Sequence, residues 1–303
     1  MLVNSFRFQK PTIVRPETVI NHSKTDSIIM KMILKFAYKL IPFKKEMYNA
    51  LKLFWTPKES IYKHLHFKGP FDVVINKTKK FIIYNNNSQI ENEIFWEGLT
   101  GKWEKESLKL WINLCKNAQS IIDIGANTGV YSLAAKTVNP YAKVYAFEPH
   151  PLFFEQLRKN VKKNNFDIQC YQQAVSNVDG NLTIADYSGQ KQNISVNSVT
   201  LNTFISQHKI DCVDLMKIDV ETYEPQVMEG FSKYLLDFQP TIIIEILNNH
   251  VAEKIFNAVK NLNYLYFNIN ENGGIRQTKS IEKSDYYNYL LCKKDVALKL
   301  ELV

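Results

Sequence analysis

From Ser120 onward, short apolar runs alternate with amphipathic helical stretches, and this alternation limits the fold more than any other feature of the sequence. Strands that alternate with helices in this way form a parallel sheet covered by helices on both faces. The predicted strands are 120–123, 143–147, 167–171, 215–219, 241–246, 264–269 and 287–292. We therefore predict an α/β fold with a doubly wound, mostly parallel, seven-stranded sheet.

The stretch from Ser120 to Gly129, Ser-Ile-Ile-Asp-Ile-Gly-Ala-Asn-Thr-Gly, predicts a strand, a tight turn and the start of a helix. Gly125 and Gly129 are typical of places where the backbone bends sharply or lets a ligand approach closely. The free N–H groups at the start of the helix predicted over 130–136 would face such a ligand. Right-handed crossovers place this turn at the carboxyl edge of the sheet, where folds of this kind bind ligands.

The first third of the chain lies outside the alternating pattern. We predict a flexible tail over 1–27, a basic extension over 28–103 and an α/β domain over 104–303. The elements predicted in the extension are an amphipathic helix at 28–41, a second helix at 45–55, a β-hairpin at 71–84 and an aromatic and acidic loop at 96–104.

The positive charge of the chain is concentrated in this first third. Residues 1–103 carry 17 Lys and Arg against 8 Asp and Glu, whereas the whole chain has a net charge of +8. The helix at 28–41 has an apolar face and a lysine-bearing face, which leaves two alternatives. It either packs on the domain or in a homo-oligomer, or it makes peripheral membrane contact through residues 28–45. Nucleic acid is not an expected partner, because the chain has only four arginines.

Targeting signals are not evident. No apolar run reaches the ~18 residues of a membrane span, and residues 1–10 lack the apolar core of a signal peptide. The four cysteines are scattered without metal-ligand spacing, which fits a reducing compartment. We therefore expect a cytoplasmic protein, either free or peripheral at the inner membrane surface.

A glutamate at the end of the second strand of the domain indicates a ribose site. Glu148 follows Gly125 by 23 residues, and an acidic residue at about this spacing commonly accepts hydrogen bonds from ribose hydroxyls. The Gly-x-x-x-Gly spacing of the turn differs from the dinucleotide fingerprint, and Asp123 before it would repel a phosphate and attract a cation. S-adenosylmethionine combines a ribose with a sulfonium and an amino group, so it fits this acidic rim.

Three blocks of the sequence together resemble the FkbM-type family of S-adenosylmethionine-dependent methyltransferases. They are Asp123-Ile-Gly-Ala-Asn-Thr-Gly129, Phe147-Glu-Pro149 and Met216-Lys-Ile-Asp-Val-Glu221, in the family's order. The resemblance runs from about residue 98 to 240, and more loosely to 292. It implies a Rossmann-like class I methyltransferase fold. The chain departs from the family at Thr222, where the family usually has Gly, and a bulkier residue there would alter the turn or the substrate side.

The resemblance also implies which residues bind the cofactor. The turn from Asp123 to Gly129 would hold the methionine part, Glu148 the ribose, and Ala174 would lie near the adenine. The full implied set is Glu104, Asp123, Gly125, Asn127, Thr128, Gly129, Glu148, Pro149, Ala174 and Asp219.

Carboxylates follow the ends of two neighbouring strands of the predicted sheet. Methyl transfer to a hydroxyl requires alignment of the acceptor and benefits from a base or a metal that takes the proton. Asp219 is our first candidate for catalysis, followed by Glu245 and Glu221. Asp219 and Glu245 are also candidate Mg²⁺ ligands, since Mg²⁺ prefers oxygen ligands. The alternative is that Glu221 and Glu224 bind backbone groups or cap the next helix.

His150 and His250 follow the strand ends at Glu148 and Glu245, where either could act as a general base near neutral pH, although a histidine in such a place is more often a partly exposed loop residue. His150 is expected to border the ribose or adenine. Trp96, Trp103 and Tyr223 are candidates for the acceptor pocket, with the protein core as the alternative.

The family resemblance implies an O-methyltransferase that acts on a sugar, a glycan or another small natural product. Two alternatives stay open. One is an RNA or protein methyltransferase that uses the basic first third of the chain. The other is a catalytically impaired S-adenosylmethionine-binding module, with Thr222 as the sign of a damaged site.

Overall fold

A computed structural model describes residues 41–186 and 193–303, so the predicted tail and nearly all of the predicted helix at 28–41 lie outside the described residues. The chain divides into two compact units, residues 1–47 and 48–303, and helix α2 (Lys44–Lys52) crosses this division. Residues 48–103 therefore belong to the same compact unit as the sheet.

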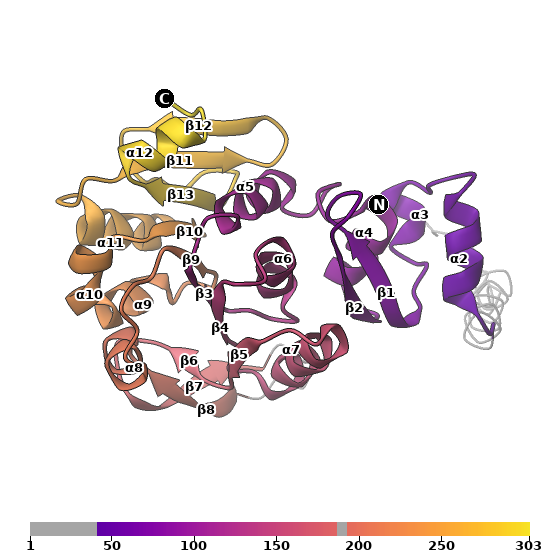
Figure 1. Cartoon of the computed structure of the whole chain (residues 1–303), viewed down its shortest axis with the longest axis horizontal. Helices are drawn as coiled ribbons and strands as arrows, with labels where there is room; N and C mark the ends of the chain where they lie inside the picture. Colours follow the sequence, from indigo (N-terminus) through magenta and orange to yellow (C-terminus); the bar gives the residue numbers. More distant parts are fainter. Residues whose placement is uncertain (1–40, 187–192) are drawn as a thin grey trace, which may run out of the picture. The chain divides into compact units, whose positions relative to one another are not determined.

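A single large sheet forms the centre of the unit 48–303 (Figure 1). Its strands are β3 (Ser120–Ile124), β4 (Lys143–Phe147), β5 (Ile168–Tyr171), β9 (Leu215–Ile218), β10 (Thr241–Glu245), β11 (Leu265–Asn270), β12 (Gly274–Thr278) and β13 (Asn288–Cys292). They lie in the order β12-β11-β13-β10-β9-β3-β4-β5. The strands from β10 to β5 are parallel to one another, and β13, β11 and β12 are antiparallel to their neighbours. The predicted α/β fold with a mostly parallel sheet is confirmed.

The sheet has eight strands rather than the predicted seven. The additional strand, β12, has the sequence Gly-Ile-Arg-Gln-Thr and is half-buried or exposed along its length. It lies at the edge of the sheet. An edge strand has a neighbouring strand on one side only, and side chains on its solvent-facing surface need not be apolar. It therefore carries no apolar run that a search for strands would detect.

Helices cover both faces of this sheet (Figure 1). One face carries α5 (Lys105–Cys115), α6 (Val130–Val138) and α7 (Pro151–Asn164). The other carries α8 (Leu201–His208), α9 (Glu224–Gly230), α10 (Ser232–Phe238) and α11 (Asn249–Val259). Because successive side chains of a strand point to opposite faces, Ile121 lies in the first core and Ile122 in the second. The helix predicted at 225–236 is two helices, α9 and α10, which meet at the buried Phe231.

Smaller elements complete the unit. A three-stranded sheet contains β6 (Ala174–Val175), β8 (Asn193–Val199) and β7 (Gly180–Ala185), and α12 (Lys294–Lys299) follows β13. No helix in residues 41–186 and 193–303 is both long enough and apolar enough to cross a membrane.

The segment before α5 packs on the sheet domain. Strands β1 (Lys68–Val74) and β2 (Lys80–Asn86) form the predicted hairpin, between α3 (Glu59–Tyr62) and α4 (Gln89–Glu97). Phe81 and Ile83 are buried in the same hydrophobic core as α6 and α7. Trp96, predicted in a loop, lies in α4, because Ser88 caps a helix there by accepting a hydrogen bond from the Glu91 N–H.

Candidate active site

A cavity of about 680 Å³ opens at the carboxyl ends of the parallel strands β3, β4, β9 and β10. Most of the side chains singled out in the sequence line this one cavity. They are Glu104, Asp123, Gly125, Asn127, Thr128, Glu148, Pro149, Ala174, Asp219, Glu221 and Glu245. Gly129 is the one member of the implied set that is not among the lining residues.

The turn after β3 requires both of its glycines. Gly125 has φ +80°, and a Cβ there would lie 1.8 Å from the carbonyl oxygen of Asp219. Gly129 has φ +95°, and its Cβ would lie 2.6 Å from Leu157 on α7. Gly125 therefore allows two strand ends to meet, whereas Gly129 allows α7 to pack against the turn. The role of Gly129 in this geometry is packing.

Glu148 holds the turn from the end of β4. One of its carboxylate oxygens accepts the Asn127 N–H at 2.8 Å, and the other accepts the His150 N–H at 2.8 Å. Burial raises the pKa of Glu148 to about 7, although these two hydrogen bonds act in the opposite direction. Because each carboxylate oxygen has two lone pairs, both retain one for a ligand in the cavity.

Asp123 lies at the floor of the cavity, at the end of β3. It is 1% exposed, and the Ser132 hydroxyl donates a 2.5 Å hydrogen bond to it. Burial raises the pKa of Asp123 to about 6. The site therefore keeps a carboxyl group in a poorly hydrated place, which favours a cationic ligand group beside it.

A buried lysine, which the sequence reasoning missed, joins the carboxylates at the other end of the cavity. Lys217 Nζ lies 2.9 Å from an oxygen of Asp219 and 4.9 Å from the centre of the Tyr131 ring. Burial by itself lowers the pKa of Lys217, but the charges of Asp219 and Glu104 outweigh it and raise that pKa. The signal was present, because a lysine between the buried Met216 and Ile218 requires an ionic partner.

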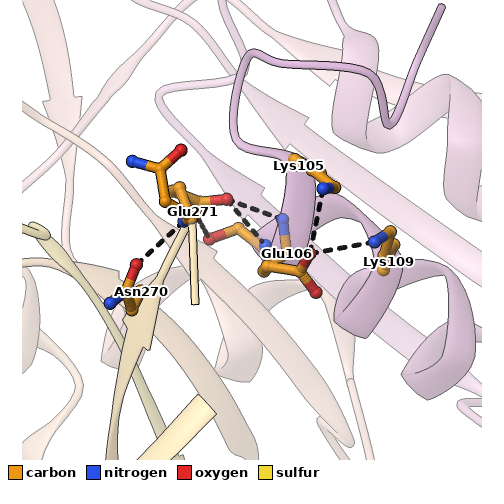
Figure 2. Close-up of polar contacts among 7 residues, drawn as sticks. Lys105, Glu106, Lys109, Asn270 and Glu271 are labelled. Atoms are coloured by element: carbon orange, nitrogen blue, oxygen red, sulfur yellow. Dashed lines mark hydrogen bonds and ion pairs between the residues drawn. The ribbon is translucent and has the colours of Figure 1, made fainter. Parts of the chain in front are cut away.

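Glu104 reaches this lysine from the start of α5. It occupies the N-cap position with a left-handed φ of 42°, but its side chain makes no cap hydrogen bond and instead accepts one from the Tyr131 hydroxyl. Glu271, in the turn between β11 and β12, caps the helix in its place (Figure 2). Its carboxylate accepts the N–H of Glu106 at 2.6 Å and that of Ser107 at 3.4 Å, and it accepts the Ser107 hydroxyl.

Glu245 and Glu221 complete the carboxylate group. Burial and the nearby charge of Asp219 raise the pKa of both. Among the described residues, no three His, Cys, Asp or Glu side chains form a group that would hold a metal ion, so the prediction of Mg²⁺ on Asp219 and Glu245 gains no support. The Lys217 ammonium already supplies a positive charge beside Asp219.

In the turn that follows β9, Glu224 and Thr222 were both singled out from the sequence. Glu224 is fully buried and accepts the Val220 N–H at 3.0 Å, as the backbone-binding alternative predicted. Thr222 has a φ of 81°, which lies in the left-handed region. The backbone therefore has to be left-handed at the position where the family usually has Gly. The turn is kept, and the threonine takes the strained conformation.

Of the aromatic and histidine side chains proposed for the site, three line the cavity and one lies in the core. Trp103, Tyr223 and His150 line the cavity, and the His150 ring nitrogen lies 2.9 Å from Asp186. Trp96 is 2% exposed and stacks with Tyr62 in the core, away from the cavity lining.

With this geometry established, comparison with known proteins identifies the family. Residues 123–276, just over half of the chain, match the model of the Methyltransferase FkbM domain. The chain belongs to the FkbM methyltransferase domain family. Both Asp123 and the Asp219–Glu245 segment fall within the matched part, whereas Glu104 precedes it.

Curated relatives in this family are distant. Methyltransferase 1 of Beauveria bassiana is 22% identical over 43% of this chain and 65% of its own length. The hexuronic acid methyltransferase AglP of Haloferax volcanii is 22% identical over 51% of this chain and 66% of its own length. The 31-O-demethyl-FK506 methyltransferase FkbM of Streptomyces tacrolimicus is 25% identical over 36% of this chain and 58% of its own length. The chain thus spans less than two thirds of each.

Among solved structures, the methyltransferase FkbM from Methylobacillus flagellatus KT aligns with 57% of this chain and 43% of its own. Its TM-score is 0.40 and its sequence identity 14%.

Proposed function

We propose that the chain is an S-adenosylmethionine-dependent methyltransferase that acts on a hydroxyl group of a sugar, a glycan or another small natural product. The observation that carries this proposal is the acidic lining of the cavity. Six carboxyl side chains line it, and its basic groups within residues 41–186 and 193–303 are Lys217 and His150. Such a lining is poorly suited to a phosphate and well suited to a ligand that joins hydroxyls to a cation.

The residues present fit S-adenosylmethionine at three places. Glu148 has free lone pairs for the two ribose hydroxyls, and Asp123 with the turn after it would hold the cationic methionine part. Ala174 of β6 and the apolar side chains of β7 that line the cavity would form a wall for the adenine. When bound, S-adenosylmethionine supplies an electrophilic methyl group on a sulfonium.

The acceptor hydroxyl would bind beside Asp219, at the ends of β9 and β10. The Asp219 carboxylate would take the proton of that hydroxyl, and the Lys217 ammonium beside it would offset the surrounding negative charges. Glu245, whose pKa is raised, would keep its proton near neutral pH and donate a hydrogen bond to the acceptor. The two carboxyl groups would thereby orient and deprotonate one hydroxyl.

The curated relatives support a small acceptor, since one is a hexuronic acid methyltransferase and another acts on a demethylated FK506. An RNA acceptor fits less well, because the carboxylates of the cavity would repel its phosphates. The charge at the site therefore favours the small-molecule proposal over the RNA alternative.

The test is isotope transfer to a panel of acceptors. The protein would be incubated with S-adenosylmethionine carrying a trideuterated methyl group and with sugars and glycans, and products analysed by mass spectrometry. We expect one labelled methyl per acceptor, and Asp219→Asn should lower the rate by about 10²–10⁴-fold. Asp211→Asn, an exposed aspartate before β9, is the control.

Cofactor binding without any labelled acceptor would favour the impaired binding module. No binding of S-adenosylmethionine at all would exclude the proposal.

We also propose peripheral contact with an anionic membrane, on the cytoplasmic side, through residues 28–45. The turn that follows α2 is a separate candidate for such contact. Leu53 and Phe54 in that turn are 79% and 88% exposed, and Trp55 is 49% exposed. Apolar side chains of this kind near lysines are typical of interfacial segments.

Vesicle sedimentation tests this contact. We expect the protein to sediment with anionic but not with neutral vesicles, and we expect Leu53→Ser/Phe54→Ser to abolish this binding. Concentration-dependent dimerisation without vesicle binding would instead indicate a homo-oligomer.

A further inference from the structure

Strand β2 and helix α4 precede the part of the chain that matches the family, yet both hold the turn after β3 by hydrogen bonds. The Thr128 hydroxyl donates to Glu91 on α4 at 2.5 Å. The Thr128 carbonyl accepts Asn160 Nδ2 at 2.8 Å, and the Asn160 oxygen in turn accepts the Tyr84 N–H of β2 at 2.9 Å. Thr128 is therefore fixed at both its side chain and its backbone by contacts that lead to the first third of the chain.

The environment of Glu91 is unusual for a carboxylate. It is 1% exposed, and one oxygen binds Thr128. The second oxygen is buried without a hydrogen-bond partner among the residues that the structure describes. A buried carboxylate with an unsatisfied oxygen destabilises the folded protein. An apolar side chain of similar volume would pack there at lower cost, so stability alone does not explain a glutamate at this position.

The partner of Glu91 is in contact with the cavity. Thr128 lines it, and the preceding residue, Asn127, donates its N–H to Glu148. Ile90, next to Glu91 on α4, also lines the cavity. We call the part of the cavity proposed to bind S-adenosylmethionine the donor site. A change in the position of Thr128 would therefore alter both the part of the donor site that would hold the methionine and the part that would hold the ribose.

We propose that Glu91 is a positioning residue of the donor site, which orients the Thr128 hydroxyl and thereby holds the turn after β3 in the conformation that binds S-adenosylmethionine. This inference rests on the proposed function. It makes the hairpin and α4 a working part of the donor site, although neither belongs to the matched family region.

The test is a double-mutant cycle on donor affinity, measured by calorimetry with S-adenosylmethionine on the full chain. Glu91→Ala and Thr128→Val should each weaken binding about 10-fold, which corresponds to one lost hydrogen bond. The double variant should bind no more weakly than the weaker single variant, because both changes remove the same contact. Glu91→Gln should stay close to the wild type, since its amide oxygen accepts the same hydrogen bond.

The matched control is Glu93→Ala. Glu93 lies on the same helix and is also buried, but it faces Lys102 at 3.9 Å. The Glu93→Ala variant should leave the affinity for S-adenosylmethionine unchanged.

Three outcomes would overturn the inference: unchanged affinity in Thr128→Val, additive losses in the double variant, or equal losses in Glu91→Gln and Glu91→Ala. If Glu91→Ala does not fold, Thr128→Val and Glu91→Gln still decide the question. A wild-type protein that does not bind S-adenosylmethionine would refute the proposed function itself, which is a separate result.

Discussion

Lys217 has the most demanding environment of any single side chain in the site. Its ammonium is fully enclosed, and the charged form of the side chain is stabilised mainly by Asp219, with further support from Glu104 and Glu245. These three carboxyl groups come from the residue after β9, the start of α5 and the end of β10, so one lysine links three elements at the cavity.

Replacing this lysine should expose that dependence. We expect Lys217→Met to lower the free energy of unfolding by about 3–5 kcal/mol, because it leaves buried carboxylates without their counter-charge. Chemical denaturation measures the effect, with the exposed Lys254→Met on α11 as the control. A loss no larger than that of the control would mean that the carboxylates are neutral in the folded protein.

Thr222 offers the opposite case, a residue whose replacement should stabilise. Its φ of 81° is costly for a β-branched side chain, and Gly adopts this conformation freely. Thr222→Gly should therefore raise the free energy of unfolding by roughly 0.5–1 kcal/mol, after the greater entropy of the unfolded glycine is deducted. Thr222→Ala retains a Cβ and should give no such gain. A destabilised glycine variant in denaturant titrations would show that Thr222 makes a contact worth more than the strain.

From the sequence alone we could single out the candidate site residues whose position follows from one element. Asp123, Glu148 and Asp219 lie at or just after the carboxyl ends of strands, and strand ends can be located from apolar runs. Glu91 and Lys217 were missed because their roles depend on which distant side chains surround them.

At the scale of elements, the alternation of strands and helices was sufficient to locate the central sheet. The predicted strand at 143–147 coincides with β4, and the hairpin at 71–84 lies within β1 and β2 and their turn. Edge strand β12 and helix α4 (Gln89–Glu97) were not predicted. Strand β12 carries no apolar run, and the end of α4 was assigned to the loop predicted at 96–104. The start of α5 was also beyond local patterns, because its cap comes from a residue that lies more than 160 positions later.

This remote cap is testable. Glu271→Ala removes the acceptor of two helix N–H groups, so we expect the free energy of unfolding to fall by about 1–2 kcal/mol. The donor site should weaken as well, because the first turn of α5 positions Glu104. Thermal denaturation and calorimetry would measure the two effects, and Asn272→Ala in the same turn serves as the control. Equal stability of the two variants would mean that water caps the helix equally well.

At the scale of the whole molecule, the buried carboxyl groups couple folding to pH. The pKa of Glu148 is about 7 and that of Asp123 about 6 in the folded protein, above their ordinary values of 4.5 and 3.8. Between the ordinary and the raised pKa, the folded chain binds protons that the unfolded chain has released. Stability must therefore fall as pH rises through this interval.

For the cofactor-free protein we expect the free energy of unfolding to decrease from about pH 4.5 to about pH 7, with Glu148 responsible for about 3 kcal/mol. Denaturant titrations at pH 5, 6 and 7 test this. Glu148→Gln should flatten the slope between pH 6 and 7, whereas the exposed Glu155→Gln should not. A stability that rises over this range would contradict the assignment.

The cap that Glu271 provides also determines how this protein can be recombined with its relatives. A chimaera in which residues 123–276 are exchanged for those of another family member would replace Glu271 while keeping the α5 backbone that it caps. It would likewise separate Thr128 from Glu91, and Asn160 from Tyr84. A functional exchange therefore has to carry the hairpin, α4 and α5 along with the matched region, as a block from about residue 68 onward.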